Sequence, residues 1–346
     1  MIPRTAVTWQ GSDWQNALAT AIRHPQELLE ALNLPLSALP QTLAAAGDFS
    51  LRVPRDYVAR MKKGDPHDPL LLQVLPAAEE LTATPGYSAD PVGELAAMPV
   101  PGLLHKYAGR ALLITTGACA IHCRYCFRRQ FPYAEAAAAR THWAPALAYL
   151  AADSSIGEII LSGGDPLLLT DQRLAELLKN LAAIPHLQRL RIHSRVPVVL
   201  PERITADLIK LLSGTRLRAI MIIHSNHANE INAPVGDALI RLAQAGITLM
   251  NQAVLLKGVN DTPEAQIKLH ETLFEYGVLP YYLHLLDKVH GAAHFQIDRQ
   301  QALDLYTQLR QQLPGYLLPR MVQEQAGLPY KVPGEHLEDF SAGGLM

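Results

Sequence analysis

Three cysteines, Cys119, Cys123 and Cys126, are the residues of this chain best suited to chemistry. They are all the cysteines of the 346-residue sequence, and their spacing is Cys-x3-Cys-x2-Cys. An iron–sulfur cluster held by three thiolates leaves one iron open to a substrate or cofactor. A structural zinc site needs four ligands, and only His122 in the same loop offers a fourth. The spacing favours a cluster with an open iron, while a zinc site and three buried structural cysteines remain alternatives.

The elements that must position these cysteines form a repeating pattern. Apolar runs alternate with helix-type patterns from residue 111 onward. The six runs cover residues 111–116, 158–162, 187–193, 217–224, 247–255 and 278–285. The helical patterns cover residues 134–152, 171–184, 203–213, 235–245, 263–276 and 298–312. Runs that are apolar throughout are typical of parallel strands buried on both faces. The pattern predicts an α/β fold, a partial (βα)6 TIM-type barrel whose chemistry lies at the carboxyl ends of its strands.

Polar residues follow these predicted strands one after another. The cysteine loop follows the first, and Ser162, Gly163, Gly164 and Asp165 follow the second. Further polar groups stand at 193–195, 224–227, 257–261 and 287–290. Glycine lets the backbone approach a ligand closely because it has no Cβ. Six polar groups on one predicted rim indicate a single lined cavity.

Three parts of the chain differ in pattern. Residues 1–95 are predicted to form a mainly helical region, with one helix from Trp14 to Leu32. In that region, 70–75 is a candidate strand or buried turn. Residues 96–313 hold the barrel core, and 314–346 form a carboxyl-terminal segment in which 316–322 is one more candidate strand.

The composition predicts a soluble globular protein that binds neither nucleic acid nor membranes. Hydrophobic residues make up 49% of the sequence, charged residues 18%, and the formal net charge is -2. No apolar run is long enough to span a bilayer, and residues 1–10 lack the apolar core of a signal peptide. Three clustered cysteines also argue against a disulfide framework, so we expect a reducing, cytoplasmic setting.

The cysteine loop resembles that of the radical S-adenosylmethionine (SAM) superfamily. A wider set of motifs, from about residue 100 to 335, is similar to lysine 2,3-aminomutases. Those motifs are Cys123-Arg-Tyr-Cys126-Phe-Arg128-Arg129, Leu161-Ser-Gly-Gly-Asp-Pro-Leu-Leu168, Ser194-Arg-Val-Pro-Val-Val-Leu-Pro-Glu-Arg-Ile-Thr205, His227-Ala-Asn-Glu230 and Asn251-Gln-Ala-Val-Leu-Leu-Lys-Gly-Val-Asn-Asp261. The resemblance implies a [4Fe-4S] cluster on the three cysteines, with SAM at the open iron and against the glycine turn at 162–165.

The same resemblance implies a second cofactor, pyridoxal 5'-phosphate (PLP). Lys331 matches the lysine that holds it, Lys106 and Arg110 match a phosphate-binding pair, and Tyr107 lies beside the ring. This role needs a lysine amine that can lose its proton to bond to PLP and can then be replaced on PLP by the α-amine of the substrate. The family has a run of glycines before this lysine, whereas here only Gly327 remains.

The substrate implied is an amino acid with a distal ammonium group. Arg128 matches the family's carboxylate-binding arginine, and a guanidinium suits bidentate recognition of a carboxylate. Asp287 matches one acid that would bind the ammonium. Glu324 stands where the family has a second aspartate, which keeps the charge but moves it by one methylene.

The resemblance is strongest to short bacterial members that make (R)-β-lysine for modification of elongation factor P. It implies that L-α-lysine is converted to (R)-β-lysine, with an electron donor such as flavodoxin or ferredoxin. Longer members carry further zinc-binding cysteines that this chain lacks, so a homo-oligomer would assemble differently. The alternatives are an aminomutase for another amino acid, such as glutamate, and a non-catalytic iron–sulfur sensing or binding protein.

Overall fold

A computed structural model describes residues 13–136 and 143–336, and within them nine strands form one sheet in chain order. The strands are β1 (Leu103–Tyr107), β2 (Arg110–Thr116), β3 (Glu158–Gly163), β4 (Arg189–Ser194), β5 (Arg218–His224), β6 (Thr248–Val254), β7 (Leu279–His284), β8 (Arg320–Gln323) and β9 (Val332–Pro333). Strands β2 to β8 are parallel, and β1 and β9 pair antiparallel at the two edges. The fold is therefore α/β with a mixed sheet, and β2 to β7 confirm the six predicted strands.

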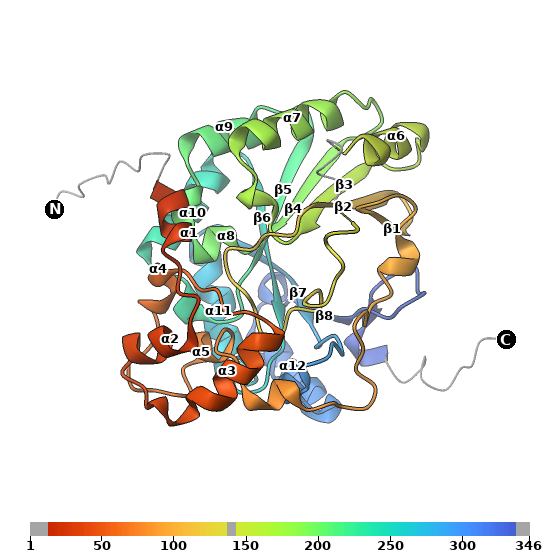
Figure 1. Cartoon of the computed structure of the whole chain (residues 1–346). Helices are drawn as coiled ribbons and strands as arrows, with labels where there is room; N and C mark the ends of the chain where they lie inside the picture. Colours follow the sequence, from red (N-terminus) through yellow and green to blue (C-terminus); the bar gives the residue numbers. More distant parts are fainter. Residues whose placement is uncertain (1–12, 137–142, 337–346) are drawn as a thin grey trace.

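A helix lies between most of these strands, and the helices gather along the outside of the sheet (Figure 1). They are α6 (Ala144–Ala152), α7 (Asp171–Ala182), α8 (Val196–Val199), α9 (Ala206–Ser213), α10 (Ala233–Gln244), α11 (Pro263–Glu275) and α12 (Arg299–Gln312). Threonine hydroxyls cap three of them, since Thr170 accepts from the backbone N–H of Arg173, Thr205 from that of Leu208 and Thr262 from that of Ala265. The helix predicted at 134–152 is seen only from Ala144, and its residues 137–142 lie outside the described residues.

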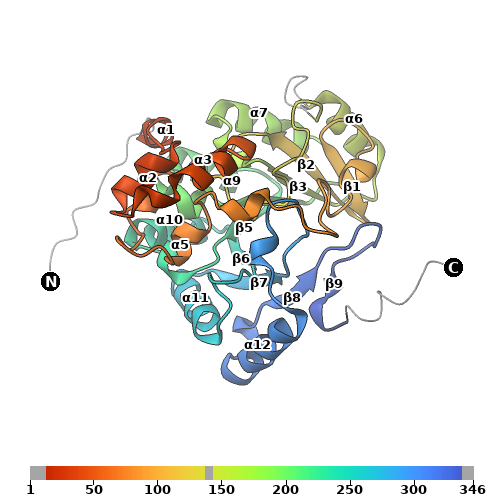
Figure 2. The same ribbon diagram turned by 60° about the horizontal axis from the view of Figure 1, so that its bottom comes forward.

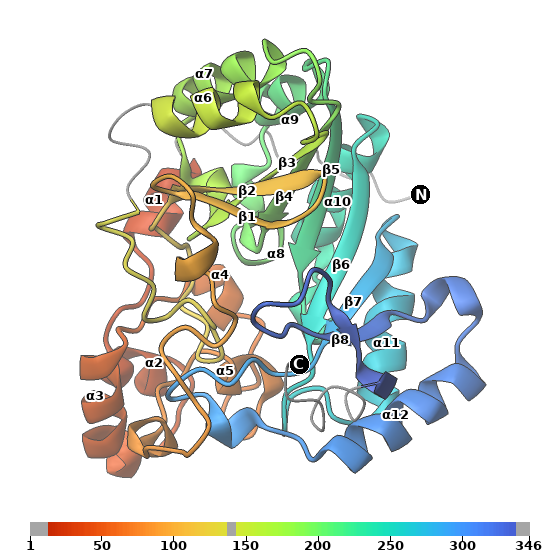
Figure 3. The same cartoon turned by 90° about the vertical axis from the view of Figure 1, so that its right-hand side faces the viewer.

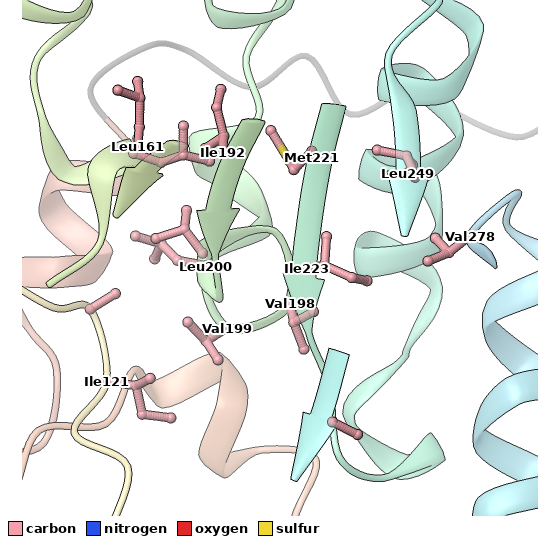
Figure 4. Close-up of a cluster of buried hydrophobic side chains, with 14 of the residues drawn as sticks. Ile121, Leu161, Ile192, Val198, Val199, Leu200, Met221, Ile223, Leu249 and Val278 are labelled. Carbon is pink, nitrogen blue, oxygen red and sulfur yellow. The ribbon is translucent and has the colours of Figure 1, made fainter. Parts of the chain in front are cut away.

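The core lies between the sheet and these helices. Every residue of β3 is buried, as expected for a strand covered on both faces. Figure 4 shows Ile192 and Ile223 on adjacent strands, with Val199 of α8 and Ile121 of the cysteine loop in the same cluster. The core thus extends to the cysteine loop, where Ala120 and Ile121 pack into it.

The amino-terminal region is helical, but two of its details differ from the prediction. The helix expected from Trp14 to Leu32 is two helices, α1 (Asp13–Ala19) and α2 (Pro25–Ala31). The intervening Ile22 pairs instead with Val53, and Pro25 starts the second helix. Of the two alternatives for residues 70–75, the strand is wrong and the buried turn is nearer to the structure, because the segment begins in the short buried helix α5 (Pro69–Leu72), capped by Asp68, and continues as a turn.

These helices, together with α3 (Leu39–Asp48) and α4 (Arg55–Val58), lie on one side of the molecule, away from β9 and α12 (Figure 2). Leu28, Tyr57 and Leu70 belong to the same hydrophobic cluster as the sheet. The amino-terminal region therefore packs onto the sheet. The three-part division at 95 and 313 remains a prediction.

Strands β1, β8 and β9 complete the sheet beyond the six predicted strands. The candidate strand at 316–322 is confirmed in part, because β8 covers 320–323 and pairs with β7. Figure 3 shows the chain turning back after β8 so that β9 lies beside it. No helix among the described residues combines the length and apolar character needed to cross a membrane.

Candidate active site

One cavity of about 370 Å³ opens at the carboxyl ends of the strands. Every site residue predicted from the sequence lines it. These residues are Cys119, Cys123, Cys126, Lys106, Tyr107, Arg110, Arg128, Ser162, Gly163, Gly164, Asp165, Asp287, Glu324 and Lys331. The structure therefore brings the cysteine loop and the carboxyl-terminal lysine, about 200 residues apart in sequence, to one place.

The amino-terminal region holds the cysteine loop from outside. The backbone N–H of His122 donates to Arg52 O at 2.9 Å, and that of Arg124 donates to Gln73 O at 2.9 Å. Arg52 Nη1 donates to Cys119 O at 3.1 Å. Sequence reasoning missed these contacts, which join positions about 50 to 70 residues apart and leave no local pattern.

A buried ion-pair group anchors the same loop. The Glu80 carboxylate accepts from Arg124 Nε at 2.8 Å and from Arg129 Nη2 at 2.8 Å, and both the Arg124 and Glu80 side chains are fully buried. Removing one partner from a buried ion pair leaves the other charge uncompensated, which is strongly destabilising. The loop therefore has a fixed backbone before any ligand binds.

The glycine turn after β3 packs against the start of the cysteine loop. The backbone N–H of Gly164 donates to Thr116 O at 2.7 Å, and that of Asp165 to Ala118 O at 2.7 Å. Gly163 has a φ of +121°, and a Cβ at Gly164 would lie 2.2 Å from Ala118 O. Glycine is required here by the close approach of the two backbones.

Asp165 joins this turn to the next strand. Its carboxylate accepts from Ser194 Oγ at 2.8 Å and from the backbone N–H groups of Arg195 and Val196 at 2.8 and 3.2 Å. Burial raises the pKa of Asp165 to about 6 although these donors oppose the shift. The side chain therefore positions two rim segments, and its predicted contact with SAM remains a prediction.

Arg128 makes an ion pair that the sequence did not reveal. Its Nε and Nη2 donate to the Glu94 carboxylate at 2.7 and 2.6 Å, and Nη1 donates to Ser162 Oγ at 2.9 Å. Burial alone would lower the pKa of Arg128, but the Glu94 carboxylate raises it. Glu94 lines the cavity too, so a substrate carboxylate must share this guanidinium with Glu94 or displace it.

Charged groups also gather around Lys331, and we call this part of the cavity, with Lys106, Glu324 and Asp287, its lysine end. The Glu324 carboxylate accepts hydrogen bonds from both Lys106 Nζ and Lys331 Nζ. Burial would raise the pKa of Glu324, but the two ammonium groups lower it to about 2. Lys106 also donates to Val92 O at 2.6 Å, and Arg110 lies over the Tyr107 ring at 4.5 Å. Lys106 is thus engaged with Glu324, while its predicted role at a phosphate remains a prediction.

Asp287 stands out among the acids of this cavity. Its Oδ1 is buried and accepts no hydrogen bond from the described residues. Burial raises its pKa to about 7, with Glu324 and Glu94 adding to the shift and Lys331 opposing it. A buried carboxylate without a donor is suited to receive a cation from a ligand.

Three histidines line the middle of the cavity, at the ends of their strands. Burial lowers the pKa of His193 and of His284 well below the usual range and that of His224 to about 3. His224 contacts Gln252 of β6. These imidazoles are neutral at physiological pH, so they offer hydrogen bonds without adding charge.

The residues present fit the two groups that the resemblance implies, an iron–sulfur cluster and PLP. The three thiols of one loop share a cavity, and Arg195 Nη1 donates to Cys123 Sγ at 2.7 Å. Among the described residues, no three His, Cys, Asp or Glu side chains are arranged to hold a single metal ion. At the other end, the Lys331 amine, the Tyr107 ring and the Arg110 guanidinium line one wall, which fits an aromatic aldehyde with a phosphate.

Comparison with known proteins agrees with the cysteine loop as a cluster site. Residues 108–189 match the family described as a 4Fe-4S single cluster domain. The solved structure of SuiB from Streptococcus suis bound to S-adenosylmethionine is a weak likeness, at 13% identity over 68% of this chain and 54% of that chain with a TM-score of 0.45. That likeness is too weak to bear on the chemistry.

Two relatives match almost the whole chain. The L-lysine 2,3-aminomutase of Haemophilus influenzae is 48% identical over 331 residues, which cover 96% of this chain and 98% of that protein. The L-lysine 2,3-aminomutase of Escherichia coli is 47% identical over 322 residues, which cover 93% and 94%. With the three thiols and the lysine in one cavity, these matches show that the chain belongs to the radical SAM lysine 2,3-aminomutase family and is an isomerase of the aminomutase type.

Proposed function

We propose that this enzyme converts L-α-lysine to (R)-β-lysine, using a [4Fe-4S] cluster on Cys119, Cys123 and Cys126, SAM, and PLP on Lys331. The observation that carries the proposal is the shared cavity, which places the thiols and the Lys331 amine with two acids, Asp287 and Glu324. The relatives' printed name, L-lysine 2,3-aminomutase, supports lysine as the substrate.

The bound cofactors would supply a radical that removes a hydrogen atom from the substrate and a carbonyl that carries its amino group. The chain's own part is to bind, orient and shield. Lys331 contributes an amine that Glu324 holds in position. The neutral histidines line the space between the two ends without competing for a charged substrate group. The cavity walls would limit the access of water to a reactive intermediate.

Substrate recognition follows from the charges at each end of the cavity. Asp287 and Glu324 suit the distal ammonium of lysine, whereas the distal carboxylate of glutamate would meet like charge there. Arg128 suits the α-carboxylate, which would share the guanidinium with Glu94 and Ser162 or displace one of them. Lysine is therefore favoured over an acidic amino acid.

The anchoring of PLP is tested by borohydride reduction of the PLP-loaded protein, followed by peptide mapping. We expect PLP fixed covalently at Lys331, and no such label in Lys331→Ala. Lys288→Ala is the matched control, because that lysine is exposed in a neighbouring loop. Labelling of another lysine with Lys331 unmodified would contradict the assignment.

The substrate is tested by anaerobic incubation with SAM, dithionite and isotopically labelled lysine. The expected product is (R)-β-lysine, identified by chiral chromatography. SAM cleavage without β-lysine would point to another amino acid. A reconstituted cluster with neither SAM cleavage nor PLP bound at Lys331 would favour a non-catalytic iron–sulfur binding or sensing role.

Three further parts of the proposal rest on the family resemblance. We propose that the curved sheet is the open (βα)6 barrel of this superfamily, with flanking parts 1–95 and 314–346. We also propose that a flavodoxin or ferredoxin supplies the electron in the cytoplasm. The β-lysine would then serve the modification of elongation factor P, a role supported by the near full-length match to short bacterial relatives.

A further inference from the structure

We propose that Arg195 sets the reduction potential of the cluster by donating a hydrogen bond and a positive charge to the Cys123 ligand sulfur. The contact is direct, because Arg195 Nη1 lies 2.7 Å from Cys123 Sγ. The other two cysteines also lie near arginines, Cys119 near Arg52 and Cys126 near Arg128, whose backbone N–H donates to Cys126. Among the described residues, however, the side-chain hydrogen bond from an arginine to a cysteine sulfur is that to Cys123. The inference deepens the proposed function, since it rests on a cluster at this loop.

The guanidinium is held by groups other than the sulfur. Its Nη2 donates to Gln73 Oε1 at 2.7 Å, to Glu230 Oε2 at 3.0 Å and to Tyr57 Oη at 3.2 Å. Its backbone N–H donates to the Asp165 carboxylate. The Arg195 side chain is 7% exposed, so it lies in a dry, preorganised network. These contacts orient the guanidinium, so the position of Nη1 beside Cys123 does not depend on attraction to the sulfur alone.

The network behind Arg195 is itself rigid. Glu230 Oε1 accepts from the backbone N–H groups of Asn226 and His227 at 2.8 and 3.0 Å. Asn226 Nδ2 donates to Gln73 Oε1 at 2.9 Å and to Tyr125 Oη at 2.7 Å. Tyr125 belongs to the cysteine loop, so the network closes on the segment that carries the sulfur.

The electronic consequence has a definite sign. Reduction adds one electron from an external reductant to the cluster, with no bond broken and no proton transferred. Hydrogen bonds to the sulfurs and nearby charge are among the factors that set a cluster's potential. An N–H donor and a cation stabilise the added negative charge, so Arg195 makes the potential less negative. The Glu230 carboxylate acts in the opposite direction.

The test is a redox titration of the reconstituted protein, with the reduced cluster followed by electron paramagnetic resonance. Arg195→Met removes both donor and charge. We expect the ratio of reduced to oxidised cluster at the wild-type midpoint to fall about tenfold, which for a one-electron couple is a shift of about 59 mV to more negative potential. Glu230→Gln removes a negative charge while keeping the shape, and its midpoint should move the other way.

Arg60 provides the matched control. It is a buried arginine that donates to Val198 O at 2.8 Å and to Glu230 O, and it lies over the same Tyr57 ring, but no contact joins it to a cysteine. Arg60→Met should leave the midpoint within a twofold change in that ratio. A merely structural role for Arg195 predicts that both arginine variants lose iron and that neither moves the midpoint.

Iron and sulfide content separates the possible failures. A fully loaded Arg195→Met protein with an unchanged midpoint would overturn the inference alone. Wild-type protein that assembles no cluster would overturn the proposed function instead. If Arg195→Met holds no cluster, the midpoint potentials of Arg195→Lys and Glu230→Gln provide the test. Midpoints that move in opposite directions support the inference, whereas midpoints that move in the same direction or stay unchanged contradict it.

Discussion

The two ends of the cavity are built in different ways. At the cysteine end, Asp165 and Glu230 accept hydrogen bonds from neighbouring protein groups, Arg195 donates through both Nη atoms although its Nε has no partner, and Glu80 fixes the loop from outside. At the lysine end, one carboxylate, Glu324, is shared by two ammonium groups, and a second acid, Asp287, has a buried oxygen without a donor. The first end is held mainly by hydrogen bonds within the protein, whereas at the second two ammonium groups depend on one carboxylate.

This difference indicates how each end works. A preorganised site holds a cofactor at little cost of rearrangement, which suits a cluster that stays bound. Charges paired with one another must exchange partners when a charged ligand arrives, so the lysine end has to change its contacts at each turnover. Substitutions should therefore affect cofactor retention at the cysteine end and substrate handling at the lysine end.

The largest expected effect comes from Lys331→Ala. Without its amine, turnover should fall on the order of a thousandfold or more, since no other group can take its place in PLP exchange. The cluster should be unaffected, with wild-type iron content and spectrum. Loss of iron in Lys331→Ala would contradict the difference between the two ends, because the cysteine end would then depend on the lysine end.

Gly164→Ala probes the cysteine end. The added Cβ would lie 2.2 Å from Ala118 O, so one backbone must move, and we expect a loss of roughly 3 kcal/mol or more in the free energy of unfolding. The iron content should fall as well. Gly47→Ala in α3 is the control, because nothing lies within 4 Å of the new Cβ and alanine favours a helix by about 0.5–1 kcal/mol. Chemical denaturation measures the free energy of unfolding of both variants.

Much of this architecture could be predicted because it depends on local pattern. Runs that are apolar throughout, such as that of β3, mark strands buried on both faces, and Thr170 marks a helix start. The spacing of Cys119, Cys123 and Cys126 indicated the cluster. The missed β1 also had a local signal, since Ala108-Gly109 forms a two-residue turn between Tyr107 and Arg110.

The remaining features depend on contacts between distant positions. Glu94 pairs with Arg128 across 34 positions, and Arg195 reaches Cys123 across 72. Each of these residues is a single charge in a short segment, which is also what an exposed loop looks like. Only the folded sheet brings their partners together, so no periodicity or spacing could reveal them.

A pH profile tests the unpaired acid of the lysine end. Since burial raises the pKa of Asp287 to about 7, the carboxyl is neutral at pH 6 and ionised at pH 8. Only the ionised form attracts an ammonium group, so kcat/KM for lysine should rise as the pH increases through about 7. Asp287→Asn should lower kcat/KM about tenfold to hundredfold at pH 8 and flatten this rise. A rise of the same size in the variant would assign the ionisation to another group.

The smallest effect is expected from Glu324→Asp, and it gives the sharpest contrast between the two ends. A carboxylate one methylene shorter cannot reach Lys106 and Lys331 together, but these partners exchange during turnover in any case. Because the shortened side chain keeps its charge beside both ammonium groups, we expect a change of only about threefold in KM for lysine and a loss of about 1 kcal/mol in stability, the size of one hydrogen bond. The same shortening at the cysteine end, Glu230→Asp, withdraws a carboxylate from Arg195, Asn226 and His227 and leaves buried donors unpaired. That variant should lose about 2–3 kcal/mol in the free energy of unfolding, with little change in KM. Steady-state kinetics and denaturation of the two variants together would show whether one end is rigid and the other adaptable, and equal losses of stability would mean that both ends are equally preorganised.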